Sequence, residues 1–151
     1  MAVTFTKMPN FIEHCAEKVH NLSADSIRIA LSNTAPASEA SNPTTAGNGV
    51  LANVTQISYT NYTDNLTVDR VLESVTSSVS GSTYTFDAGD VVITASGGAL
   101  ATFQYIYVYN DTPTSPADPL ICLIDNGAAI TLASGESATI AWNASGVLTV
   151  A

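Results

Sequence analysis

The residues that could do acid–base or nucleophilic chemistry are few and scattered. His14 and His20 lie six residues apart in a segment that favours a helix, which leaves them about 120° apart around the helix axis. His14 is next to Cys15, but adjacent helical side chains point in different directions and do not form a nucleophile–base pair. We therefore expect both histidines on a solvated helix face, without a catalytic or metal-binding role.

The aspartates give a similar result. Asp87, Asp90, Asp111 and Asp125 fall in predicted turns, where carboxylates can bind calcium if several converge or hydrolyse glycosides at a defined separation. Aspartate is also a favoured turn residue in its own right, and this is the interpretation we adopt. The sequence contains no Gly-x-Ser-x-Gly elbow, phosphate-binding loop or dinucleotide fingerprint. We expect no enzymatic activity, no metal and no cofactor.

The composition of the chain limits the kinds of molecule to which the protein could bind. Of the 151 residues, 46% are apolar and 11% charged, with four basic residues against thirteen acidic ones and a net charge of −9. Four scattered cations form no basic stripe, which argues against binding to nucleic acid or to an anionic membrane surface. No apolar run approaches the roughly 20 residues of a membrane helix. A polar but weakly charged surface favours a protein that keeps much of its surface against other protein.

The cysteines and aromatic residues favour a packed interior. Cys15 and Cys122 lie among apolar neighbours, so we expect two buried thiols, with a disulfide as the alternative that sequence leaves open. Aromatic rings could instead form a sugar-binding platform, but alternate tyrosines in strands more often belong to the core or to subunit contacts. The aromatic residues concerned are Tyr59, Tyr62, Tyr105, Tyr107, Tyr109 and Trp142.

The segment over residues 101–110 is predicted to be the central strand. Aromatic and β-branched residues dominate it, without Gly or Pro. Both of its faces carry apolar bulk, which indicates a strand buried on both sides. From Thr83 onward short strands recur every eight to twelve residues, separated by turns such as residues 125–127. We expect a mainly β chain that forms a single domain over residues 1–151, an antiparallel jelly-roll-like β-sandwich.

One N-terminal α-helix is predicted over about residues 10–22, after an arm over residues 1–9. Asn10 can cap this helix, with Glu13 three residues further on. Apolar residues recur at helical spacing at Phe11, Cys15, Val19 and Leu22. We expect this stripe to hold the helix against the sheet. An extended segment is predicted over residues 66–79.

Residues 33–49 form a predicted long loop rich in Asn, Thr, Ala, Pro, Ser and Gly. A run of this length without periodicity exceeds the usual loop, so it is either an interaction loop or a floppy excursion. We expect the loop and the N-terminal arm to reach neighbouring proteins, so deleting residues 37–48 should weaken binding without unfolding the domain. Candidate contact residues are Val3, Phe5, Pro36, Glu39, Pro43, Tyr59 and Tyr62.

Several segments together resemble a known family. They cover residues 105–112, 118–121, 125–127, 130–136 and 146–149 in the C-terminal half, and residues 16–22 and 30–36 in the N-terminal half. This set of strand and turn patterns resembles the small virion structural proteins of tailed bacteriophages. The resemblance covers most of the chain apart from residues 37–49, and its motifs specify no chemistry.

The resemblance implies a component of a phage particle. The most specific expectation is a head decoration (cement) protein, made in the host cytoplasm and placed on the outer capsid surface of the virion. Such a protein would bind the major capsid protein and stabilise contacts between its subunits. It would also bind itself, as a homotrimer in preference to a dimer. The alternatives are a tail or baseplate structural component and a carbohydrate-binding adhesion module.

Overall fold

The structure is a computed structural model that describes residues 2–62 and 70–151, and the chain is mainly β. The paired strands run antiparallel, as expected. Of the extended segment predicted over residues 66–79, the first four residues, 66–69, lie outside the described residues. The elements in chain order are β1 (Thr4–Lys7), α1 (Phe11–Ala16), β2 (Ile27–Ser32), the 3₁₀ turns η1 (Pro36–Ser38) and η2 (Leu51–Asn53), β3 (Thr76–Ser80), β4 (Thr83–Asp87), β5 (Val91–Thr94), β6 (Leu100–Asn110), β7 (Leu120–Leu132), β8 (Ser137–Ile140) and β9 (Leu148–Val150).

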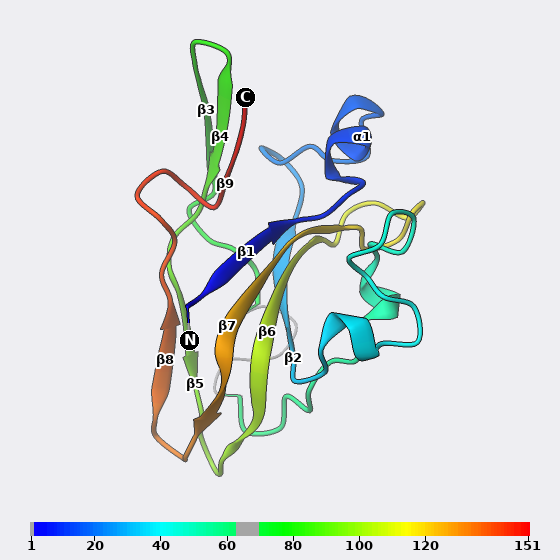
Figure 1. Cartoon of the computed structure of the whole chain (residues 1–151). Helices are drawn as coiled ribbons and strands as arrows, with labels where there is room; N and C mark the ends of the chain where they lie inside the picture. Colours follow the sequence, from blue (N-terminus) through cyan, green and yellow to red (C-terminus); the bar gives the residue numbers. More distant parts are fainter. Residues whose placement is uncertain (1, 63–69) are drawn as a thin grey trace.

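The central element is a four-stranded sheet in the order β1-β7-β6-β2 (Figure 1). β6 pairs with both neighbours, so that Ile106 lies opposite Leu31 on one side and Ile124 on the other. The last five residues of β6, 106–110, are all buried. This confirms the prediction of a central strand buried on both faces for that half of β6.

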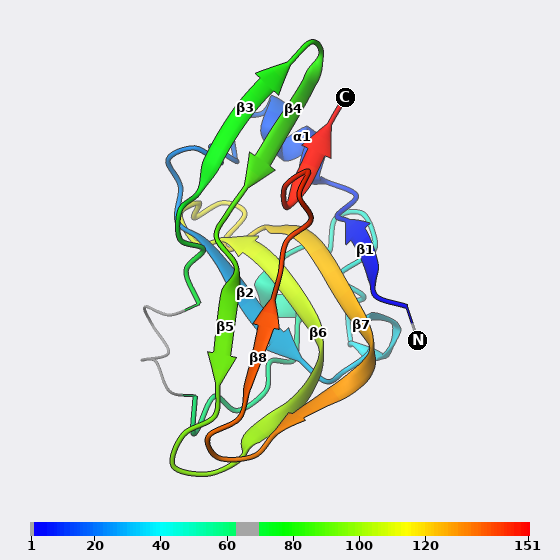
Figure 2. The same cartoon turned by 90° about the vertical axis from the view of Figure 1, so that its left-hand side faces the viewer.

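A second layer of strands lies across this sheet. Figure 2 shows β5 and β8 in front of β6 and β7. Phe86, Ile93 and Phe103 come from β4, β5 and β6, are no more than 1% exposed, and belong to one core cluster. Each fully buried side chain of this size contributes about 1.5–3 kcal/mol, so these contacts hold the two β layers together. Phe11 of α1, at 0% exposure, belongs to the same cluster.

A three-stranded ribbon, in the order β3-β4-β9, projects beyond the end of the four-stranded sheet (Figures 1 and 2). β4 is followed directly by β5, and β8 by β9, so the ribbon continues the second layer. The β3–β4 hairpin turns at Gly81, whose φ of 62° is in the left-handed region that such a tight turn requires.

The turn predicted over residues 125–127 is wrong, because β7 runs unbroken through it. The pairing with β6 shifts register just beyond Asp125. Gly127 has a φ of 73°, and its N–H donates to the Asp125 carboxylate at 2.7 Å. These features describe a β-bulge, in which turn-forming residues bend a strand instead of reversing it.

The helix predicted over residues 10–22 is too long, because α1 has only six residues. Lys18 adopts a left-handed φ of 63°, and the Val19 N–H donates to the His14 carbonyl at 2.8 Å, which closes the last turn. The chain then doubles back into the interior. His20 is consequently only 7% exposed and not on a solvated helix face as predicted.

Candidate functional site

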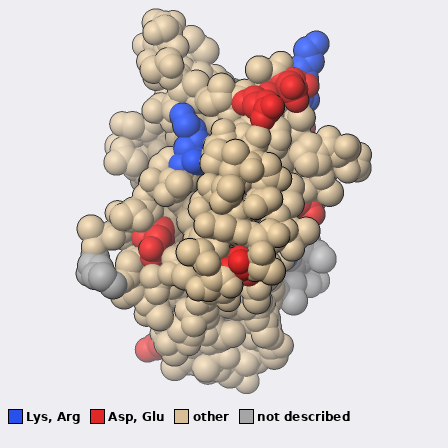
Figure 3. Space-filling view, turned by 45° about the vertical axis from the view of Figure 1, so that its right-hand side comes forward, with Lys and Arg blue, Asp and Glu red and all other residues tan. Residues whose placement is uncertain are grey.

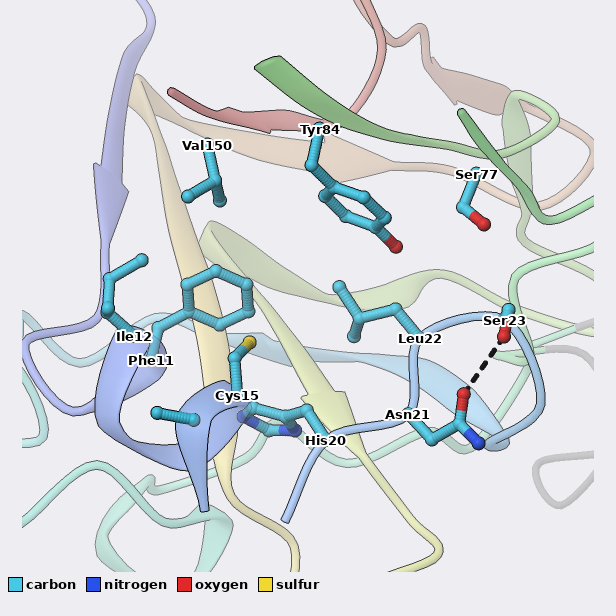
Figure 4. A pocket seen from close by; sticks show the side chains of 11 residues that line it. Phe11, Ile12, Cys15, His20, Asn21, Leu22, Ser23, Ser77, Tyr84 and Val150 are labelled. Atoms are coloured by element: carbon cyan, nitrogen blue, oxygen red, sulfur yellow. Dashed lines mark hydrogen bonds between the residues drawn. The ribbon is translucent and has the colours of Figure 1, made fainter. Parts of the chain in front are cut away.

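A cleft of about 520 Å³ opens between α1 and the ribbon (Figure 4). Figure 4 shows side chains from the α1 segment pointing toward side chains of β4 and β9 across the opening. We call this cleft the notch; its lining includes Phe11, Cys15, His20, Leu22, Tyr84 and Val150. Its size and largely apolar walls are typical of a binding site.

The ribbon over the notch is amphipathic. Strand pairing puts Val79 directly opposite Tyr84, and Tyr84 directly opposite Val150, so these three side chains share one face of the ribbon. We call them the apolar row. Two of them line the notch, while Val79 is 70% exposed. The other face is polar, with Thr76, Ser78, Thr83, Thr85, Asp87 and Thr149.

The notch is electrically neutral at neutral pH. Its lining contains no Asp, Glu, Lys or Arg. Burial, followed by the neighbouring His14, lowers the pKa of His20 to about 4, although Asp25 acts in the opposite direction. Burial also raises the pKa of the Cys15 thiol, against the opposing effect of Lys7. The notch therefore offers apolar contacts and a protonated thiol, and not an activated nucleophile.

His20 also belongs to a buried polar network. The Asn110 side-chain amide donates to the Asp25 carboxylate at 2.6 Å and lies 3.2 Å from His20 Nδ1. The Asn110 side-chain carbonyl accepts the Thr112 N–H at 3.1 Å. Asn110 is fully buried. One amide side chain thus joins the segment after α1 to the end of β6.

The N-terminal arm contains β1, a strand of the chain's own sheet, with Phe5 opposite Ile124. Within the described residues the other edge of β1 is unpaired, and Val3 and Phe5 are 63% and 48% exposed. The Met8 N–H donates to the Ile121 carbonyl at 3.0 Å. Because backbone groups alternate in direction along an antiparallel strand, the N–H and carbonyl of Phe5 point to the open edge.

The loop over residues 33–49 is folded against the body. The Glu39 carboxylate accepts both the N–H and the hydroxyl of Thr55, each at 2.8 Å. Pro43 is buried and Pro36 is half-buried in η1. The predicted contact role of Pro43 is therefore corrected, because its side chain packs inside the chain, and Glu39 is engaged within its own chain. Deleting residues 37–48 would remove these internal contacts, so we now expect it to destabilise the domain.

The same loop is tied to α1. The Asn10 side-chain carbonyl accepts the Gly47 N–H at 2.6 Å, and its amide donates to Glu13. Asn10 occupies the N-cap position of α1, as predicted, but its side chain makes no capping hydrogen bond to the helix backbone. At the end of the loop the Leu120 N–H donates to the Gly49 carbonyl at 2.8 Å. Asn10 therefore links the start of α1 to the loop.

Replacing Glu39 with alanine is expected to lower the free energy of unfolding by about 1 kcal/mol, since two charge-assisted hydrogen bonds to Thr55 are lost from a partly exposed site. Urea denaturation measures this loss, and limited proteolysis should cut residues 33–49 faster in the variant. Glu17→Ala, at an exposed carboxylate, is the control. Equal stability and equal cleavage in Glu39→Ala and wild type would show that the carboxylate does not anchor the loop.

Tyr59 and Tyr62 hold their segment against the body. The Tyr59 hydroxyl accepts the Leu31 N–H at 2.9 Å and donates to Gln56 at 2.8 Å. The guanidinium of Arg70 lies 4.2 Å from the centroid of the Tyr59 ring. Tyr62 is 8% exposed and contacts Tyr59 edge-on. The prediction of a partner contact at Tyr62 is therefore corrected, because this ring is part of the core.

Two of the strand tyrosines, Tyr107 and Tyr109, are not open to a sugar. Tyr107 and Tyr109 are 0% and 3% exposed, which confirms the core interpretation for these two residues. Tyr105 is half-buried, as is Trp142, whose indole N–H donates to the Gly89 carbonyl at 2.8 Å. Stacking on a sugar needs an open ring face, which the two buried tyrosines lack.

Within residues 2–62 and 70–151, no group of three or more His, Cys, Asp or Glu is placed to hold a metal ion. Cys15 and Cys122 are both free thiols, the first half-buried and the second buried. None of the described helices has the length and apolar character needed to cross a membrane.

Sequence reasoning missed the notch and the apolar row. Val79 stands alone among Ser and Thr, and so gives no amphipathic pattern by itself. A signal was present in the hairpin, because a two-residue turn at Gly81 places Val79 opposite Tyr84. Comparison with models of protein families, with curated protein sequences and with solved structures finds no match to this chain.

Proposed function

We propose that the protein is a capsid decoration protein of a tailed phage. It binds the outer capsid surface as a homo-oligomer and stabilises contacts between major capsid subunits, and its two β layers are arranged in a jelly-roll-like manner. The proposal starts from the resemblance of its strand and turn segments to small virion structural proteins. The observation that carries it is the open edge of β1, where Val3 and Phe5 are exposed.

An open strand edge can bind a protein by strand addition. The backbone groups of Phe5 face that edge, and its ring is 48% exposed beside them. A strand of a capsid subunit paired with β1 would extend the sheet across the joint and cover this ring. Opening of the capsid lattice would then have to break the backbone hydrogen bonds between β1 and the capsid strand and expose the Phe5 ring again. This added cost of opening stabilises the closed lattice.

The character of the surface supports a protein partner. Figure 3 shows one face on which Lys, Arg, Asp and Glu occupy only small areas among uncharged atoms. Charged residues make up 11% of the chain, well below the roughly 25% of an average protein. Depletion of charge is characteristic of the core of protein–protein interfaces.

The copy number per purified particle tests the proposal directly. Quantitative mass spectrometry against the major capsid protein should give a simple fraction of the capsid protein count. A handful of copies per particle would instead indicate a tail or baseplate component. Absence from the particle would overturn the proposal and favour a role outside the virion.

Replacing Phe5 with proline is expected to weaken capsid binding at least about 10-fold while the fold remains intact. Proline has no N–H, and the N–H lost at this position faces the open edge and not β7. The hydrogen bonds between β1 and β7 therefore persist, as is usual for proline on an edge strand. Co-sedimentation with purified capsids measures the binding, and circular dichroism checks the fold.

Two variants separate the backbone from the ring. Phe5→Val keeps the N–H and should lose only the part of the binding that comes from the aromatic ring. Thr6→Pro removes an N–H that faces β7, and should destabilise the protein itself. Binding of Phe5→Pro at the wild-type level would contradict strand addition at β1.

A further inference from the structure

The open edge of β1 carries a cation as well as an aromatic ring. Lys7 comes two residues after Phe5, so its N–H and carbonyl also point away from β7, and the two side chains share one face of the strand. Both residues are exposed. Figure 2 shows that β5 and β8 of the second layer do not overlie β1. A strand that pairs with this edge therefore meets the Phe5 ring and the Lys7 ammonium together.

The charge of Lys7 is not used within its own chain. In the part of the chain that the structure describes, the one salt bridge joins Arg28 to Asp111 at 3.0 Å. The guanidinium of Arg70 lies over the Tyr59 ring. Lys7 has neither an ion-pair partner nor a ring contact among the described residues. An incoming strand can therefore supply the first carboxylate that this ammonium meets.

Charge complementarity determines the kind of strand that fits. The chain has thirteen acidic residues, four basic residues and a net charge of −9, so its surface as a whole repels an acidic partner. The binding edge is different, because β1 has the sequence Thr-Phe-Thr-Lys and no acidic residue. Opposite charges directly across two paired strands attract each other, and like charges repel. An acidic side chain on the incoming strand is therefore favoured opposite Lys7.

We propose that β1 selects an acidic strand of the major capsid protein, with an aspartate or glutamate directly opposite Lys7 and an apolar side chain directly opposite Phe5. All paired strands of the described chain are antiparallel, and antiparallel addition at β1 puts the acidic residue two positions before the apolar one. The partner segment then reads acidic-x-apolar. The inference rests on the proposed function and deepens it, because it specifies which strand the β1 edge recognises.

Zero-length cross-linking tests this contact on the protein bound to purified capsids. A carbodiimide joins an amine to a carboxylate without a spacer, so it links only groups that touch. We expect mass spectrometry to find Lys7 joined to an aspartate or glutamate of the major capsid protein, with an apolar residue two positions later. Capsid-bound protein in which Lys7 forms no such cross-link, or is joined to a segment without the acidic-x-apolar pattern, would overturn the inference.

Two matched charge reversals give a second readout. Lys7→Glu and Lys18→Glu change the net charge equally and replace an exposed lysine in each case, but only Lys7 lies in β1. In co-sedimentation with capsids we expect Lys7→Glu to bind about 10-fold more weakly than wild type, since an attraction becomes a repulsion. Lys18→Glu should stay within about 2-fold of wild type. Both side chains are exposed, so both variants should fold, which circular dichroism checks.

The outcomes separate this inference from strand addition itself. Loss of capsid binding in Phe5→Pro together with wild-type binding in Lys7→Glu would overturn the selection of an acidic strand and leave strand addition at β1 in place. Wild-type binding in both variants would overturn both ideas. Weakened binding in both, with Lys18→Glu unchanged, is the result we expect.

Discussion

Replacing Asn110 with alanine is expected to lower the free energy of unfolding by about 3 kcal/mol, although the residue touches no surface. Its side chain is fully buried and makes contacts with three different partners. The amide donates to Asp25 at 2.6 Å and lies 3.2 Å from His20 Nδ1, while the carbonyl accepts the Thr112 N–H at 3.1 Å. Alanine would satisfy none of these groups.

The size of this effect follows from the groups left behind. A buried polar group that loses its partner costs about 1–3 kcal/mol, and a charged group costs more. Asp25 keeps a second hydrogen bond, from the Asn21 N–H at 2.7 Å, so its loss is only partial. The Thr112 N–H and His20 Nδ1 lose the contacts that Asn110 makes with them. Together these losses give a cost of about 3 kcal/mol.

Thermal and urea unfolding measure the prediction. For a domain of this size 3 kcal/mol corresponds to a decrease in Tm of about 6–12 °C. Asn143→Ala is the matched control, because this asparagine is exposed and its side chain only accepts the Ser145 N–H at 2.9 Å in a turn. The control should change stability by no more than about 0.5 kcal/mol. A decrease below about 1 kcal/mol for Asn110→Ala would mean that the network does not stabilise the fold.

The strands could be predicted from the sequence, because their signal is local. In β6, aromatic and β-branched residues on both faces indicated a strand buried on both sides, and residues 106–110 are buried. Turn residues were harder to interpret. Residues 125–127 have the composition of a hairpin turn, yet their geometry is that of a bulge within β7. The same left-handed glycine fits both structures, so only the pairing with β6 decides between them.

The helix and the loop depended on tertiary contacts. The apolar stripe after Phe11 favours a longer helix. Instead, the left-handed backbone at Lys18 turns the chain inward, and His20 and Leu22 lie in the interior. The loop over residues 33–49 has the composition of a free segment. Its anchors are distant in sequence, as with Glu39 and Thr55. Pairings of this kind leave no periodic pattern in the sequence.

The candidate surfaces were predictable only in part. Val3 and Phe5 are exposed on an open edge of the chain's own sheet. Tyr62 and Pro43 are buried, because an aromatic ring or a proline in a loop can cover the core as readily as it can meet a partner. The notch brings α1 together with β4 and β9 from the other layer. No spacing in the sequence reveals that arrangement.

Stability is expected to fall between pH 6.5 and pH 4 because of His20. Burial and the neighbouring His14 lower the pKa of His20 from 6.5 to about 4, and the Asp25 charge opposes them only partly. An amide N–H₂ can only donate, so the Asn110 contact needs an unprotonated Nδ1. The His20 Nε2 atom is buried without a hydrogen-bond partner among the described residues. His20 is therefore harder to protonate in the folded protein than in the unfolded chain.

The direction of this pH dependence follows from the number of protons that His20 binds in the folded and in the unfolded chain. Between pH 6.5 and about 4 the unfolded chain binds more protons at His20 than the folded chain, so the free energy of unfolding increases with pH in this window. The contribution of unprotonated His20 to the free energy of unfolding is fully present above pH 6.5. It is reduced by ~2 kcal/mol at pH 5 and by ~3 kcal/mol at pH 4. Below that pH both states bind the proton and this contribution becomes constant.

His20→Gln isolates the effect, because glutamine keeps a hydrogen-bonding side chain and does not titrate. The variant can be less stable than wild type at pH 7.5, since the substitution disturbs the network, but that difference is not the readout. Urea unfolding at pH 7.5 and pH 5 should show that wild type loses about 2 kcal/mol more than the variant over this interval. Parallel losses in the two proteins would mean that His20 titrates alike in the folded and unfolded chain. In that case its burial beside Asn110 would not make folding sensitive to acid.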